Sequence, residues 1–235
     1  MELELQIKQL EEELNKNRSN IVIYTLLEDK IRQLKEELKK IRRKKKRTAN
    51  RDIKYLRYEE FQHLIKTIEN NGDYFWMRDK LLFLIAFECG LRATEVGNLK
   101  KEDFFSDKRE MFCRRLKGSR NNTVKLTQDT SILLESFMER YSNDSPYIFL
   151  SRKKIPITKF TLNKICKKYF KSASLPMEKA HFHTIKHTAG VHMAEEGLDI
   201  KEVQYILGHR NVDNTMIYFD FTTKQQESLY SKLGR

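Results

Sequence analysis

Two spacings of apolar residues divide the chain into a helical N-terminal stretch and a longer globular part. Over residues 1–48, which hold no glycine or proline, apolar positions recur in heptads on two tracks offset by one residue. The tracks are Ile7, Leu10, Leu14, Ile21 and Tyr24, and then Leu27, Ile31, Leu34, Leu38 and Ile41. The offset predicts either one coiled coil with a stammer or a break near residues 17–20 that folds two helices into a hairpin.

The heptad stretch ends in a strongly basic run. Eight of the nine residues from Lys39 to Arg47 are cationic. Such a run is either a solvated linker or, in a protein that binds nucleic acid, a segment that lies along phosphates and adds affinity without sequence preference. We expect the second role for Arg42, Arg43, Lys44, Lys45, Lys46 and Arg47. The apolar tracks favour self-association, and the alternative is an amphipathic helix that packs on its own chain.

From Tyr55 onward the pattern becomes that of a globular domain built mostly of helices. Helical spacing covers Phe61–Ile68, Met77–Cys89, Ser131–Tyr141, Leu162–Phe170, His183–Glu196 and Asp199–Leu207. Gly90 is predicted to end the second of these helices and Gly208 the last. Asp199 and Glu202 form a capping pair at the start of the last helix.

Two short strands are predicted between the helices. They cover Glu110–Lys117 and Thr123–Leu126 and are joined through Gly118 and the Asn121, Asn122 pair. The predicted fold class is therefore mainly α with a small antiparallel β-sheet (α+β). The expected domains are residues 1–48 and residues 55–235.

Charge and composition narrow the choice of partner. Lysine and arginine number 46 against 33 acidic residues, a formal net charge of +13. This excess favours nucleic acid first and an anionic membrane surface second. The longest apolar run, Leu81–Phe87, is far shorter than the roughly 20 residues that span a bilayer, and the N-terminus lacks the pattern of a secretory signal. We therefore expect a soluble cytoplasmic protein with no membrane partner.

The cysteines add no site of their own. Cys89, Cys113 and Cys166 are scattered, without the paired spacing of a metal site or a disulfide framework. We expect reduced thiols, mostly in the core.

Arg92 is the first polar residue in an unusual place. It follows the apolar helix and Gly90 directly, at the start of the next helix. An arginine there can present its planar fork to a phosphate or a carboxylate. Taken alone, a structural salt bridge is the commoner role.

His183, Lys186 and His187 stand at positions i, i+3 and i+4, on one face of a predicted helix. A metalloprotease site would need a glutamate directly after the first histidine, where this chain has Thr184. The other interpretations are a cationic cluster that faces a phosphate and histidines without a functional role. The sequence predicts no metal site.

Together with two later residues, these positions resemble the tyrosine recombinase (phage integrase) family. Arg92 with Glu95, the His183–His187 block, Leu207–His209 and Tyr218 occur in that family's order and approximate spacing. The resemblance covers about Leu56–Tyr218 and rests on several separated boxes. It implies the family's catalytic domain over residues 55–235, preceded by a coiled-coil helix or helical hairpin.

The resemblance implies site-specific cleavage and rejoining of double-stranded DNA without metal, ATP or another cofactor. Tyr218 matches the family nucleophile, which attacks a phosphodiester to give a 3′-phosphotyrosyl link and a free 5′-hydroxyl. Arg92 would hold the non-bridging oxygens, and Glu95 would orient Arg92. Lys117 matches the lysine that protonates the leaving 5′-oxygen, although Arg120 lies close by.

The remaining matches imply further roles around the phosphate, and one position departs from the family. His183 would assist proton transfer with Tyr218, His209 would hydrogen-bond the phosphate, and His187 matches a supporting histidine. Lys186 stands where the family has the arginine of its His-x-x-Arg box, and lysine lacks the planar bidentate contact. Removing one such donor costs on the order of 2.7 to 4 kcal/mol of transition-state stabilisation, and a retained charge should cost less, so we expect slower chemistry.

A second departure concerns length: residues 1–48 are too few for the helical domain that completes the family's clamp around DNA. Three functions therefore remain open. The first is an active integrase or resolvase that works on DNA as a homodimer or tetramer. The second is a non-catalytic relative that regulates a full-length recombinase, and the third is DNA relaxation by the same cleavage chemistry, as in type IB topoisomerases.

Overall fold

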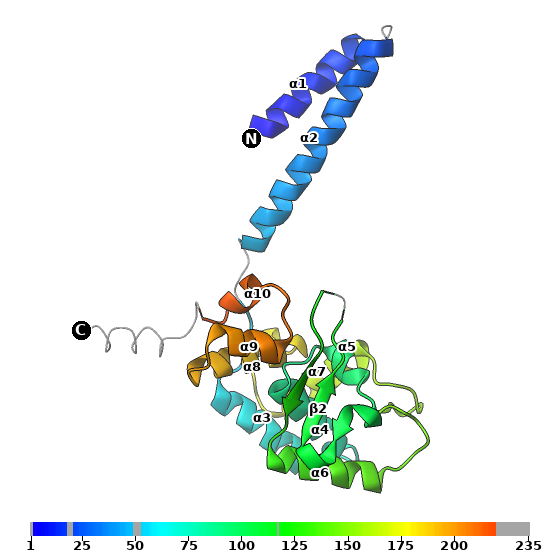
Figure 1. The fold of residues 1–235 in the computed structure, drawn as a ribbon, viewed down its shortest axis with the longest axis vertical. Coiled ribbons are helices and arrows are strands. Elements are labelled where there is room, and N and C mark those ends of the chain that lie inside the picture. Colours follow the sequence, from blue (N-terminus) through cyan, green and yellow to red (C-terminus); the bar gives the residue numbers. More distant parts are fainter. Residues whose placement is uncertain (1, 18–20, 49–52, 117, 220–235) are drawn as a thin grey trace, which may run out of the picture. The chain divides into compact units, whose positions relative to one another are not determined.

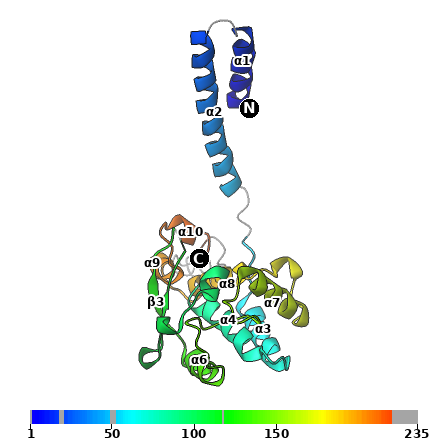
Figure 2. The same cartoon turned by 90° about the vertical axis from the view of Figure 1, so that its right-hand side faces the viewer.

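The structure is a computed structural model that describes residues 2–17, 21–48, 53–116 and 118–219, without the side chains at positions 2, 4, 21 and 40–48. The chain divides into two compact units, residues 1–52 and 53–235. Figures 1 and 2 show the helices and strands of both units in two views.

The first unit is a pair of helices, α1 (Glu2–Lys16) and α2 (Ile21–Thr48), that lie side by side in Figure 1. Ile7 of α1 is buried with Ile31 and Leu34 of α2. A salt bridge of 2.6 Å joins Lys35 Nζ to Glu11 Oε1. The break predicted near residues 17–20 thus separates two helices that pack on each other, and the hairpin is the arrangement observed. The basic run falls at the end of α2, where the side chains lie outside the described residues.

The second unit is mainly helical, as predicted. Its helices are α3 (Tyr58–Asn70), α4 (Trp76–Glu88), α5 (Ala93–Gly97), α6 (Gln128–Arg140), α7 (Lys159–Ser172), α8 (His183–Glu195), α9 (Ile200–Leu207) and α10 (Asp213–Met216). Local signals set several of their ends. Thr127 caps α6 by accepting a hydrogen bond from the Thr130 backbone, so this helix begins before the predicted Ser131. Asp199 and Glu202 form the predicted capping box of α9.

The sheet differs from the prediction in number and length of strands. It has three antiparallel strands in the order β1 (Phe104–Phe105), β2 (Glu110–Cys113) and β3 (Asn122–Lys125). β1 is too short to show a periodicity. β2 ends before the predicted Lys117 because its continuation bonds elsewhere: Arg115 N donates to Asn121 Oδ1 and Leu116 N donates to Glu95 Oε1.

The core is centred on α4, which packs against α3, α6 and α8. Leu81, Leu82, Phe83 and Ile85 are all fully buried, so this helix has apolar residues on every side. The three cysteines are buried and free, as expected. Nowhere in the described ranges is a helix long and apolar enough to cross a bilayer.

A smaller apolar cluster packs at the C-terminal end of α8. It is formed by Val191, Ala194, Val203, Leu207 and Tyr218. In both views α9 and α10 lie at one end of this unit and α6 at the opposite end. The candidate nucleophile is therefore part of the packing that holds α8 and α9 together.

Candidate active site

Four segments of the second unit carry the candidate site. They are the α4–α5 turn with α5, the β2–β3 loop, α8, and the segment that runs from the end of α9 through α10 to Tyr218. The matched residues that they bring together are Arg92, Glu95, His183, Lys186, His187, His209 and Tyr218. Lys117 lies outside the described residues, as do the side chains of Arg42–Arg47 in the other unit.

Arg92 stands at the start of α5 and is held from two sides. Its Nη1 donates to Glu95 Oε1 and to Ser119 Oγ, each at 3.0 Å. The Arg92 side chain remains 33% exposed, whereas that of Glu95 is fully buried. The salt bridge therefore fixes the direction of the guanidinium and leaves part of it open to a ligand.

Glu95 joins α5 to the β2–β3 loop. Its two oxygens accept hydrogen bonds from Arg92 N at 2.8 Å and from Leu116 N at 3.1 Å. Burial alone would raise the pKa of Glu95. The two backbone N–H groups and the charges of Lys186 and Arg115 outweigh burial and hold its pKa below the ordinary value. Glu95 is thus the anion among several cations.

Lys186 is directed inward rather than toward solvent. The residue is 1% exposed. Its Nζ donates to Gly90 O at 2.6 Å and to Leu207 O at 2.8 Å. Burial, followed by the charges of Arg115 and Arg92, lowers the pKa of Lys186 well below its ordinary value. This geometry differs from the phosphate-facing cation that the sequence led us to expect.

Tyr218 is buried, with its hydroxyl on His187. The phenol Oη lies 3.1 Å from His187 Nδ1. Burial raises the pKa of the Tyr218 phenol above its ordinary value, and the charge of Arg92 acts in the opposite direction. A Cβ added at Gly190 would lie 2.8 Å from three atoms of the Tyr218 ring. The ring therefore packs in the space that a side chain at position 190 would fill.

His209 follows the end of α9 and is also buried. Its Nδ1 lies 3.0 Å from Thr215 Oγ1. Its backbone pairs with Ser119, the residue whose hydroxyl contacts Arg92. The β2–β3 loop is therefore anchored at Ser119 beside both Arg92 and His209.

The histidines are held in the neutral form. Burial, reinforced by neighbouring positive charge, lowers the pKa of His187 to about 3 and that of His209 to about 3. His183 is more exposed; partial burial of its ring, then Lys186 and Arg92, lower its pKa as well. His187, not His183, is the histidine that touches Tyr218 in this structure.

Four residues of this site were not predicted from the sequence. They are Arg115, Ser119, Gly190 and Thr215. For Arg115 a signal existed: Met111 and Cys113 are buried, so the period of two along the strand places Arg115 on the inner face and Arg114 outside. The other three act through tertiary contacts that leave no local pattern.

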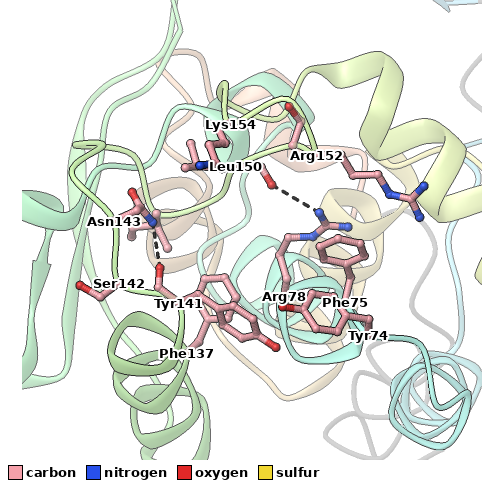
Figure 3. A pocket seen from close by; sticks show the side chains of 12 residues that line it. Tyr74, Phe75, Arg78, Phe137, Tyr141, Ser142, Asn143, Leu150, Arg152 and Lys154 are labelled. Atoms are coloured by element: carbon pink, nitrogen blue, oxygen red, sulfur yellow. Dashed lines mark hydrogen bonds between the residues drawn. The ribbon is translucent and has the colours of Figure 1, made fainter.

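Two hollows in this unit differ in their relation to the site. One of about 320 Å³ is lined mostly by polar residues, among them Arg120, Asn121, Lys201 and His209. A larger one of about 510 Å³ is lined by aromatic and basic residues such as Tyr74, Phe75 and Arg78, with Tyr141 and Arg152 (Figure 3). None of the matched site residues lines the larger hollow. Within the described ranges, no three His, Cys, Asp or Glu side chains gather as a metal site.

Sequence comparison decides the family. The profile of the Phage integrase family matches residues 54–225, well over half of the 235 residues. The chain belongs to the phage integrase family. Within it, Tyrosine recombinase XerA of Pyrococcus furiosus is 32% identical over 174 residues, which cover 73% of this chain and 58% of the relative. Tyrosine recombinase XerC of Caldanaerobacter subterraneus is 29% identical over 76% of this chain and 50% of its own length.

Solved structures agree on the fold. The crystal structure of XerA recombinase matches with a TM-score of 0.66 at 24% identity, over 76% of this chain and 64% of that one. XerH site-specific recombinase, bound to a palindromic difH substrate in a post-cleavage complex, matches with a TM-score of 0.67 at 24% identity, over 78% and 54%. This integrase-family chain thus spans less than two thirds of the XerA and XerC relatives.

Proposed function

We propose that this chain is a site-specific DNA recombinase of the integrase type that cleaves and rejoins DNA through a phosphotyrosyl intermediate. The observation that carries the proposal is the meeting of Tyr218, Arg92 and His209 from separate segments at one place in the family's fold. The XerA and XerC relatives support it because both are named tyrosine recombinases.

The proposed reaction needs a nucleophile, cations for the phosphate and a proton donor for the leaving group. Tyr218 Oη attacks the scissile phosphorus, a P–O bond to tyrosine forms, and the bond to the 5′-oxygen breaks. Arg92 and His209 hold the non-bridging oxygens. Lys117 gives its proton to the 5′-oxygen, which leaves as a hydroxyl. When a 5′-hydroxyl attacks the phosphotyrosine, these steps run in reverse and the strand is rejoined.

The phenol proton has an acceptor in the structure. His187 Nδ1 is 3.1 Å from Tyr218 Oη, within reach of the phenol proton. The lowered pKa of His187 keeps its ring neutral, although it also makes the ring a weak base. His183, four residues earlier, meets the His187 ring edge to face at 4.4 Å between centroids. We therefore place His187 first in the path of the proton and His183 in support, the reverse of the roles implied by the resemblance.

Burial of Tyr218 means that a local shift must precede attack. The residue is 1% exposed and its hydroxyl is occupied by His187. Tyr218 follows the four-residue helix α10, so the segment that has to move with the tyrosine is short. A non-catalytic relative that regulates another recombinase is the second candidate, favoured by this burial and by the inward direction of Lys186.

We propose double-stranded DNA and a second copy of the chain as partners. XerH is named as bound to a palindromic substrate, and a palindrome presents the same half-site to each of two copies. The helical hairpin would join copies, and the basic run at its end would lie along phosphates. Deleting residues 1–47 should then lower both the oligomeric state in sedimentation and the affinity for DNA. If both values are unchanged, the hairpin does not join copies and the basic run does not bind phosphates.

A nicked duplex tests the cleavage chemistry. Cleavage next to the nick releases a short oligonucleotide by diffusion, so the covalent intermediate accumulates. Incubated in EDTA with duplexes selected for binding, the parent should form an adduct that survives denaturation, and Tyr218→Phe should bind the same duplexes without forming it. If the parent forms none and Tyr218→Phe behaves like it, the regulatory function replaces the enzymatic one. On a supercoiled circular duplex, a product with changed linking number but no exchanged strands favours relaxation.

A further inference from the structure

Arg115 is a buried cation whose hydrogen bonds all run inward. Its side chain is fully buried. Its Nη1 donates to Gly90 O at 3.0 Å, and its Nη2 donates to Cys89 O at 2.8 Å and to Ile206 O at 2.6 Å. Its Nε donates to Asn122 Oδ1 at 3.0 Å. These contacts use most of the five N–H donors of a guanidinium, so Arg115 presents no fork to a ligand.

Lys186 shares an acceptor with Arg115. The oxygen of Gly90 receives the Lys186 ammonium at 2.6 Å as well as the guanidinium. The second contact of the ammonium, with Leu207 O at 2.8 Å, is one residue from the carbonyl of Ile206 that binds Arg115. Both cations therefore bridge the same two pieces of backbone.

These pieces are the C-terminal ends of two helices. α4 ends at Glu88, just before Cys89 and Gly90, and α9 ends at Leu207. The last carbonyls of a helix have no partner within it and carry partial negative charge. Cations at such ends are stabilising, and here two helix ends converge on one pair of cations.

Glycines bring the two ends into contact. Gly90 and Gly208 both adopt left-handed backbone, with φ of 57° and 67°. A Cβ on Gly90 would lie 2.3 Å from Leu207 Cδ2, and one on Gly208 would lie 2.8 Å from Arg115 Nε. The turns therefore pack with no space for a side chain between them.

Each turn leads directly into a candidate phosphate ligand. Arg92 is two residues after Gly90, and His209 directly follows Gly208. We propose that Lys186 and Arg115 form a positioning clamp, which sets the separation of Arg92 and His209 and touches no phosphate. The inference rests on the proposed function, but it gives Lys186 a different role from the arginine whose position it matches.

The clamp gives a physical reason for lysine at position 186. The guanidinium of Arg115 already lies against Gly90 O. A compact ammonium with freely rotating donors fits between two carbonyls beside it, whereas a second planar fork needs more space and a different approach. Glu95, whose Oε2 is 3.6 Å from Arg115 Nη1, supplies a negative charge next to the pair.

Substitution of Lys186 by arginine distinguishes contact with the phosphate from a role in the clamp, because the two roles predict opposite changes in the rate of adduct formation. If Lys186 contacts phosphate, Lys186→Arg restores a bidentate ligand and adduct formation on a nicked duplex becomes faster. If it belongs to the clamp, Lys186→Arg crowds Arg115, and a displacement of Arg92 by about 1 Å slows the single-turnover rate by on the order of 10- to 100-fold. A faster Lys186→Arg variant overturns the proposal.

A second variant tests whether crowding is the cause. Arg115→Leu leaves the space beside Gly90 open, so Lys186→Arg in that background should cleave faster than Arg115→Leu alone. If Arg115→Leu with Lys186→Arg is slower than either single variant, the two cations do not share one space and the clamp is wrong.

Arg78→Met is the matched control for loss of a buried cation. Arg78 is 8% exposed and donates to Leu150 O at 3.3 Å, remote from the clamp. This variant should lose stability in urea but keep the parent's adduct rate; a rate that falls as far as in Lys186→Met would show that the assay reports general destabilisation and would overturn the assignment.

Hydrogen exchange tests the clamp independently of catalysis. Lys186→Met and Arg115→Leu should each raise exchange of the Gly90 and Gly208 amides together, because both turns lose a shared partner. Failure of the parent to form any adduct would refute the proposed function while this measurement still decides the clamp. Exchange that rises at only one of the two turns contradicts the clamp.

Discussion

Tyr218 and Gly190 show how a single missing side chain shapes the site. The phenol ring lies where a Cβ of residue 190 would be, and the hydroxyl reaches His187 on the preceding turn of the same helix. Gly190 has no local signature, because a glycine inside a helix pattern looks the same whether or not a ring packs on it. The sequence therefore predicted Tyr218 as nucleophile through the family resemblance, but not its seat.

Gly190→Ala should displace the Tyr218 ring, because the new methyl would lie 2.8 Å from it. Overpacking of this kind costs about 1 to 3 kcal/mol. We expect a lower urea midpoint and slower adduct formation with DNA affinity kept. In a Tyr218→Ala background the same change should cost nothing, because the clash is gone and alanine favours helix. An equal loss in both backgrounds would contradict the packing argument.

His209 should make stability depend on pH. Burial lowers its pKa to about 3, whereas an unfolded histidine titrates near about 6.5. Between these values the unfolded state binds more protons, so stability is lost as the pH falls below about 6.5. One histidine contributes at most about 1.4 kcal/mol per pH unit. Urea unfolding from pH 7.5 to 5 should show a smaller slope for His209→Gln than for the parent and for His181→Gln, at an exposed position.

At the scale of elements, the sequence predicted what local signals specify. Gly90 and Gly208 end their helices as expected, and the Asp199, Glu202 pair caps α9. The predicted end of β2 was wrong because the observed end depends on Glu95 and Asn121, which come from outside the strand. Helix ends follow from neighbours in sequence, whereas strand ends follow from partners that only the fold brings near.

The cap of α9 offers a test at this scale. Asp199 Oδ1 accepts hydrogen bonds from Lys201 N at 2.6 Å and Glu202 N at 2.9 Å. Asp199→Ala should destabilise the unit by about 1 kcal/mol and slow adduct formation, because α9 leads into His209. Thr158→Ala removes the comparable cap of α7 and should lower stability without slowing the reaction. Equal rates of adduct formation for the two variants would show that the start of α9 does not position His209.

At the scale of the whole molecule, the chain joins an integrase-family unit to a helical hairpin. The sequence predicted an N-terminal helix or helical hairpin and a mainly α unit with a small sheet, because the change from heptads to globular spacing is local. It did not predict the inward direction of Lys186, since two carbonyls from separate helices determine it.

The basic run should set the salt dependence of DNA binding. Each phosphate contact that is lost reduces the slope of log K against log salt by about 0.9. Replacing Lys44, Lys45 and Lys46 by glutamine should therefore reduce the slope by up to about 2.7. Glutamine at the exposed Lys8, Lys16 and Lys30 changes the net charge equally and should have a smaller effect. Equal slopes for the two triple variants would place the basic run away from phosphates.

The identity of the residue bound to DNA tests the central claim most directly. After reaction with a nicked duplex in EDTA, nuclease and trypsin digestion should leave a nucleotide on the peptide of residues 211–224, and fragmentation should place it on Tyr218 through a 3′-phosphate. The released strand should carry a free 5′-hydroxyl. An adduct on another residue, or a tyrosine joined to a 5′-phosphate, would contradict the assignment of Tyr218 as nucleophile.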